Sequence, residues 1–224
     1  MNHIYIGIGG WCGTAFGLKG SNLRSYALPF DWIRSKFEGV IDCLGNNFEN
    51  FLPKTYQKEK NGKMGAYRGR QFSFFHDDFE NNLNAEVDKY KRRINRFQEL
   101  LRSNQRIIFI RTTVTNNYLD EINLSNSFHS AMSEFFPDTN YKLVFIVPEQ
   151  FTTGFFCRLD EKTYCYTLND LSHDNKNLGT EYSPIFKSIK EFNLFTNPPP
   201  NAISTFSINA TSRLTVHRGK SIFI

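Results

Sequence analysis

Several features that mark common classes of protein are missing from this sequence. No run of about 18 apolar residues occurs, so we expect no transmembrane span. The N-terminal stretch has no basic segment followed by a long apolar one, which a secretory signal would need. No internal repeat or low-complexity tract is present. We therefore expect an intracellular, cytoplasmic protein.

Cysteine is scarce, and the four that occur are Cys12, Cys43, Cys157 and Cys165. No two of them have the Cys-x-x-Cys spacing that is typical of zinc knuckles and redox motifs. The spacing predicts that no structural zinc is bound. Because thiols stay reduced inside the cell, we expect four free thiols and no disulfide scaffold.

Net charge is also modest, at +5 over 224 residues. A chain of this length can bury its own core as one large domain. A mildly basic balance permits an anionic partner but does not require one. No sequence signature of a nucleic-acid-binding domain accompanies the charge, so nucleic acid is an alternative partner that we do not favour.

What the sequence does contain is an alternation of apolar runs and amphipathic stretches. The apolar runs predict strands at 3–9, 71–76, 106–111, 143–147 and 164–168. The other periodic segments predict helices at 14–19, 29–44, 83–102, 117–136 and 183–194. Strands that alternate with helices predict an α/β or α+β fold, a layered sheet with helices on its faces. We expect one domain over residues 1–224, with 198–224 as a C-terminal extension that can supply strands.

The first candidate site is a glycine-rich loop around a cysteine. Cys12 follows a predicted strand and two glycines, just before the predicted helix. The N–H groups at a helix N-terminus stabilise a thiolate, and the same groups can hold an oxyanion. Gly10, Gly13 and Thr14 are therefore candidates for an oxyanion or substrate loop. The alternative is a small buried cysteine in a glycine-rich turn. Neither a dinucleotide-binding nor a phosphate-binding loop pattern is complete here.

Two further segments offer partners for such a thiol. His76 ends an aromatic strand and is followed by Asp77, so it can act as a general base with an adjacent carboxylate. The alternative is an exposed histidine before a helix that Asp77 or Asp78 caps. Asp31 lies among apolar residues, where a carboxylate needs a partner. It can orient a histidine, pair with Arg24 or cap a helix.

The helix over 83–102 carries a basic surface. Arg92, Arg93 and Arg96 lie on it and can bind an anion. A solvated helix face is the simpler interpretation, and we favour it.

Several of these motifs together resemble a known family. They are the Gly-Gly-x-Cys-Gly-x-Ala segment at 9–15, Pro-Phe-Asp-Trp-Ile at 29–33, Phe-Phe-His-Asp at 74–77 and the Tyr-x-Arg-Arg-x-x-Arg-Phe helix at 90–97. The chain is similar over roughly residues 4–150 to bacterial and large-DNA-virus proteins described as papain-like cysteine peptidases of unknown function. The resemblance implies that Cys12 is the nucleophile and His76 the base, and a viral member would act in the host cytoplasm.

The leading hypothesis is a cysteine-dependent hydrolase or acyl transferase that acts on an acyl or peptide substrate. Asp77 or Asp31 would orient the imidazole, and no metal or organic cofactor would be needed. One alternative is an SGNH-like hydrolase, whose opening block the loop also resembles and whose late Asp-x-x-His pattern occurs at 170–173. Others are an α/β protein that binds phosphate, nucleotide-sugar or nucleic acid through the glycine-rich loop and arginine-rich helix, and a non-catalytic host-interaction protein.

Overall fold

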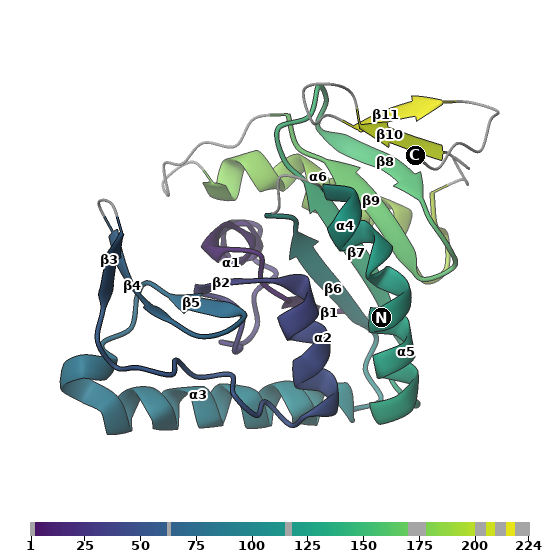
Figure 1. The fold of residues 1–224 in the computed structure, drawn as a ribbon. Helices are drawn as coiled ribbons and strands as arrows, with labels where there is room; N and C mark the ends of the chain where they lie inside the picture. Colours follow the sequence, from purple (N-terminus) through teal and green to yellow (C-terminus); the bar gives the residue numbers. More distant parts are fainter. Residues whose placement is uncertain are drawn as a thin grey trace.

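The computed structural model describes residues 3–61, 64–114, 118–169, 178–199, 205–208 and 214–217. Its centre is a five-stranded sheet in the order β1-β6-β7-β9-β8, with helices on both faces (Figure 1). Strands β1, β6, β7 and β9 pair in parallel, and β8 pairs antiparallel with β9. This architecture confirms the predicted α/β class.

The central strands are short, and all but β8 are almost wholly buried. They are β1 (Ile4–Gly7), β6 (Ile107–Thr112), β7 (Tyr141–Val147), β8 (Gly154–Arg158) and β9 (Thr163–Thr167). Both faces of the sheet are covered by helices, so the strands read as continuous apolar runs in the sequence. Within β1, for example, Ile6 packs into one core and Tyr5 into the other.

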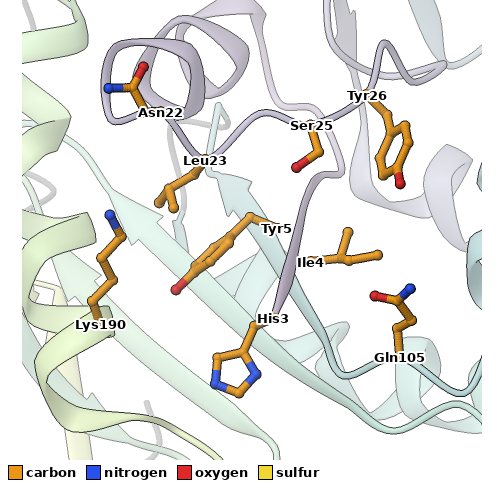
Figure 2. Close-up of a pocket in the computed structure, with 9 residues that line it drawn as sticks. All are labelled: His3, Ile4, Tyr5, Asn22, Leu23, Ser25, Tyr26, Gln105 and Lys190. Carbon is orange, nitrogen blue, oxygen red and sulfur yellow. The ribbon is translucent and has the colours of Figure 1, made fainter. Parts of the chain in front are cut away.

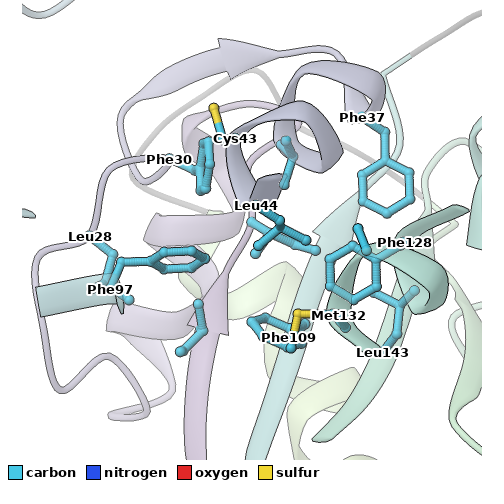
Figure 3. Packing of buried hydrophobic residues seen from close by; sticks show 14 of the residues in the cluster. Leu28, Phe30, Phe37, Cys43, Leu44, Phe97, Phe109, Phe128, Met132 and Leu143 are labelled. Carbon is cyan, nitrogen blue, oxygen red and sulfur yellow. The ribbon is translucent and has the colours of Figure 1, made fainter. Parts of the chain in front are cut away.

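Helices form the outer layers of the fold. They are α1 (Cys12–Gly20), α2 (Phe37–Gly45), α3 (Phe79–Leu101), α4 (Tyr118–Asn123), α5 (Ser125–Phe135) and α6 (Leu178–Phe192). Helices α1 and α6 share a core with one face of the sheet. Helices α2, α3 and α5 share a second core with the other face. Figure 3 shows this second core, where Phe37 of α2 stacks on Phe128 of α5 and Phe128 packs against Phe109 of β6.

A smaller antiparallel sheet lies beside α3 (Figure 1). Its order is β2-β5-β4-β3, formed by β2 (Ile33–Ser35), β5 (Phe72–Phe74), β4 (Met64–Arg68) and β3 (Glu59–Asn61). Phe30, which is fully buried, contacts both Phe72 of β5 and Phe97 of α3, with ring centroids 6.2 and 5.6 Å away. Several of the 23 phenylalanines of the chain thus attach this sheet to the core.

Within the expected C-terminal extension, β10 (Thr205–Ile208) pairs antiparallel with β11 (Leu214–His217). No helix in the described part of the chain is long and apolar enough to cross a membrane.

Two helix predictions need correction. The predicted helix 29–44 is instead a turn over 29–32, strand β2 and then helix α2. The turn forms because the carboxylate of Asp31 accepts the Leu28 N–H at 2.9 Å, which competes with helical hydrogen bonding. The predicted helix 117–136 is two helices, α4 and α5, that meet at Leu124.

Candidate functional site around Cys12

The glycine-rich loop leaves the carboxyl end of β1 and turns sharply into α1. Gly9 and Gly10 have φ values of 77° and 94°, which side chains other than glycine rarely adopt. A Cβ atom on Gly10 would lie 1.9 Å from the carbonyl oxygen of Thr112 on β6. The glycines are therefore required by the close approach of the loop to the neighbouring strand.

A buried arginine, which the sequence analysis did not single out, holds this loop. Arg111 of β6 is fully buried, and its Nε donates to Oε2 of Glu121 at 2.7 Å. Its Nη1 donates to the Ile8 carbonyl at 3.2 Å and to Ser35 Oγ at 2.9 Å. Ser35 Oγ in turn accepts the Gly10 N–H at 3.1 Å. An arginine at the end of an apolar run was the available signal, because a buried guanidinium needs partners.

Cys12 is the first residue of α1 and is half-buried. Burial raises the pKa of its thiol, while hydrogen bonds from the backbone N–H groups of Cys12 and Gly13 act in the opposite direction. The Gly13 N–H therefore lies beside the sulfur, where it can also meet an oxyanion. The Gly10 N–H is instead directed to Ser35.

A second polar network lies next to the cysteine. The Thr14 hydroxyl is within 2.9 Å of Thr112 Oγ1, which is 3.0 Å from the Tyr182 hydroxyl of α6. Burial raises the pKa of Tyr182, and the negative charge of a Cys12 thiolate raises it further. Tyr182 is therefore within electrostatic range of the cysteine. Thr14 itself is buried, so it braces α1 against β6 and α6 rather than facing solvent.

His76 is exposed and follows β5. Its ring packs edge-on against Trp32, with centroids 6.5 Å apart. Trp32 packs against Phe16 at 5.0 Å, and Phe16 lies one helical turn after Cys12. A row of rings therefore joins the face of α1 that carries Cys12 to His76. Among the described residues there is no hydrogen bond between the Cys12 thiol and the His76 ring.

The two candidate carboxylates have other partners. Asp77 is buried and contacts Lys89 Nζ at 2.7 Å, and it accepts a hydrogen bond from the Tyr90 hydroxyl at 3.0 Å. Asp78, not Asp77, caps α3 by accepting the Asn81 N–H.

Asp31 pairs with Arg24, whose Nη2 lies 2.8 Å from its carboxylate. Burial raises the pKa of Asp31, and the Leu28 N–H and Arg24 act against that rise. The Arg24 guanidinium also lies over the Trp32 ring at 5.3 Å. Asp31 therefore acts on the row of rings through Arg24, and it is not hydrogen-bonded to His76 in the described structure.

The three arginines of α3 are placed differently from one another. Arg96 donates to the Ala27 carbonyl at 2.8 Å, and Arg93 lies over the Tyr90 ring at 5.3 Å. Arg92 is exposed. The interpretation of this face as simply solvated is thus too coarse, because Arg96 joins α3 to the segment before β2, while Arg93 contacts a ring of its own helix.

The remaining histidines do not supply a described partner for Cys12. His129 hydrogen-bonds Tyr141 and Thr163, which begin β7 and β9 at the opposite end of the sheet. His173, and the side chain of His217, lie outside what the structure describes. The Asp-x-x-His pattern at 170–173 lies there too. No group of three metal-ligating side chains occurs among the described residues, and the four cysteines are free thiols.

A comparison with known protein families identifies the family of this chain. The family described as "Putative papain-like cysteine peptidase (DUF1796)" matches residues 3–151, well over half of the chain. The chain belongs to this family. The matched range contains Cys12 and His76 and ends before β8, β9 and α6, so Tyr182 lies outside it.

A curated relative is "Uncharacterized protein R408" of Acanthamoeba polyphaga mimivirus. It is 24% identical over 188 residues, which cover 71% of this chain and 84% of the relative. A large DNA virus therefore carries a similar protein. No solved structure matches the chain.

Proposed function

We propose that the protein is a cysteine-dependent hydrolase or acyl transferase in which Cys12 is the nucleophile and His76 the base. The observation that carries the proposal is the position of Cys12. It is the first residue of a helix, directly after two glycines at the carboxyl end of a parallel strand, with the Gly13 N–H beside its sulfur. Ligands of open α/β sheets bind at this end of the strands. The family name supports the same class of chemistry.

The proposed reaction begins when the Cys12 sulfur attacks a carbonyl carbon of an acyl or peptide substrate. The C–S bond forms as the thiol proton moves to His76, and the tetrahedral oxyanion accepts the Gly13 N–H. His76 then gives the proton to the leaving group as its bond to carbon breaks. Hydrolysis or transfer to a second acceptor releases the acyl group from sulfur.

Proton transfer needs a base because the thiol is mostly protonated. Burial raises the Cys12 pKa, so the thiolate fraction at neutral pH is small. His76 is linked to α1 through Trp32 and Phe16. A bridging water, or a closure of this region on substrate, would complete the path, since hydrogen bonds of catalytic pairs often tighten only in the complex.

In this proposal Asp77 and Asp31 are positioning residues. Asp77 fixes the chain next to His76 through Lys89 and Tyr90. Asp31 fixes Arg24 over Trp32, against which His76 packs. No observation favours the phosphate-binding alternative, because the glycine-rich loop is packed against Thr112 and Ser35.

The rate at which iodoacetamide labels Cys12, measured by mass spectrometry from pH 6 to 10, tests the proposal. We expect Cys12 to label faster than Cys43, Cys157 and Cys165, which are buried and serve as internal controls. His76→Gln should lower the Cys12 rate at neutral pH by about tenfold or more, because it removes the proton acceptor. An unchanged rate in His76→Gln would remove His76 from the mechanism.

Turnover of activated acyl esters and peptides gives the second test. Cys12→Ala should abolish it and leave the melting temperature nearly unchanged, because the thiol is only half-buried. Cys43→Ala is the matched control, since Cys43 lies in the core away from the loop and should retain the activity. Turnover that survives Cys12→Ala would show that the cysteine is only a packing residue.

A further inference from the structure

A pocket of about 490 Å³ opens at the amino end of β1, the end opposite to Cys12. The side chains around it come from β1, from the segment after α1, from the start of β6 and from α6 (Figure 2). Its base is formed by Ile4 and Tyr5, which are buried, and its rim includes Tyr26 and Lys190. Small-molecule sites commonly have volumes of about 300–1,000 Å³.

The base of the pocket carries a polar group, the Tyr5 hydroxyl, that a ligand can reach. Tyr5 is only 8% exposed, so most of its side chain is shielded from solvent. Figure 2 shows this hydroxyl directed into the pocket, toward the side of Lys190. Burial raises the pKa of Tyr5 to about 12, so the phenol is a neutral donor at physiological pH. A hydroxyl at the base of a pocket can donate a hydrogen bond to a ligand or to water there.

The charge around this hydroxyl is positive. Lys190 has no carboxylate partner in the described structure, and the pocket-lining residues include no acidic side chain. Burial lowers the pKa of His3, and the nearby Arg106 lowers it further. The neutral His3 ring shares a hydrogen bond with Asn193 through Nε2, and its buried Nδ1 has no partner within the described ranges.

We propose that this pocket binds a small organic anion, with a phosphate or carboxylate group between Lys190 and the Tyr5 hydroxyl and a planar group against Tyr26. An anion accepts hydrogen bonds from both the ammonium and the phenol. The half-exposed ring of Tyr26 provides an apolar face at the rim. The site is separate from Cys12 and does not depend on the function proposed for it.

Titration with phenyl phosphate, followed by calorimetry and by NMR shifts of ring signals, tests the site. Phenyl phosphate should bind saturably, with a Kd of about 1 mM or lower. Phenol lacks the anion and inorganic phosphate lacks the ring, so both should bind at least about tenfold more weakly. If phenyl phosphate fails to saturate the protein, or phenol binds as well, the proposal is wrong.

Two matched variants locate the binding. Lys190→Gln should weaken phenyl phosphate binding about tenfold, whereas Lys187→Gln, on the same helix but outside the pocket, should not. Tyr5→Phe should weaken it several-fold while the protein stays folded. Equal losses in both lysine variants would indicate non-specific attraction and overturn the proposal. Cys12→Ala should bind phenyl phosphate normally, so this result is independent of the catalytic proposal.

Discussion

The two ends of strand β1 differ in how their polar groups are satisfied. At the carboxyl end, Arg111 hydrogen-bonds Ile8, Ser35 and Glu121 and holds the loop before Cys12. At the amino end, the buried Nδ1 atom of His3 has no partner in the described structure, and the hydroxyl of Tyr5 faces the pocket. The carboxyl end of β1 is thus held by hydrogen bonds within the protein, and the amino end opens into a pocket.

The two ends therefore illustrate the different requirements of a reactive group and of a ligand pocket. A reactive group needs to be held in one geometry by partners within the protein, and those partners must be fully satisfied when buried. A ligand pocket leaves donors and acceptors for the ligand. Variants that remove one polar group at each end therefore test whether the carboxyl end depends on its internal hydrogen bonds more than the amino end does.

The largest expected effect is at the carboxyl end. Arg111→Ala should lower the free energy of unfolding by about 3–5 kcal/mol, because it removes the cation that pairs with the buried Glu121 carboxylate. Urea denaturation measures the loss. Arg106→Ala is the control at the amino end, where the guanidinium lies over Phe195 and should contribute about 1 kcal/mol or less. Similar losses in the two variants would contradict the comparison.

Gly10→Ala should lower the free energy of unfolding by a smaller amount, about 2–4 kcal/mol. The substitution combines a positive φ with a clash between the new Cβ and the Thr112 carbonyl. Gly154→Ala is the control, because Gly154 also has a positive φ but a Cβ added there would meet nothing within 4 Å. Thermal unfolding of both variants gives the extra loss of stability in Gly10→Ala. We attribute this extra loss to the close approach between Gly10 and the Thr112 carbonyl. Without such an excess, the loop does not need a glycine for packing.

Two buried tyrosines give a finer test of the contrast. Tyr182→Phe should lower the free energy of unfolding by about 1 kcal/mol because it removes the buried hydrogen bond between Tyr182 and Thr112. Tyr5→Phe should be close to neutral because the Tyr5 hydroxyl faces the open pocket. Both variants keep the ring, so packing is matched. Chemical denaturation of the two proteins side by side gives the difference. A larger cost for Tyr5→Phe would mean that this hydroxyl has a partner in solution.

The smallest effect concerns pH at the amino end of the sheet. Burial by itself would raise the pKa of Asp160, but hydrogen bonds from His129 and from the Lys162 N–H lower it below its ordinary value. The unfolded chain therefore binds this proton more readily, so stability is gained above the unfolded pKa of about 3.9 and lost as the pH falls below it.

Thermal unfolding between pH 5 and 2 measures this contribution. Asp160→Asn should lose part of the acid sensitivity, so the stabilities of the variant and the parent protein should converge as the pH falls. The effect should be small because the carboxylate is 41% exposed. An identical pH profile in both proteins would show that Asp160 does not contribute.

Local patterns were sufficient to predict most of the elements. The apolar runs predicted β1, β6, β7 and β9, because a strand buried on both faces leaves a continuous signal. The stripe over 83–102 predicted α3, whose first turn was missed because Asn82 is not helical. The helix expected from 29 failed because the buried Asp31 bonds the local backbone, a contact that apolar spacing does not reveal.

The sequence by itself determined the α/β layering and the position of Cys12 between a strand and a helix. Both depend on residue spacing and on glycine, which act over a few neighbouring residues. The tertiary structure alone decided that Arg111 holds the loop, that Asp77 pairs with Lys89 and that Tyr5 faces a pocket. These contacts join segments on different elements, and which donor meets which acceptor is set by the order of strands in the sheet and the packing of helices on it.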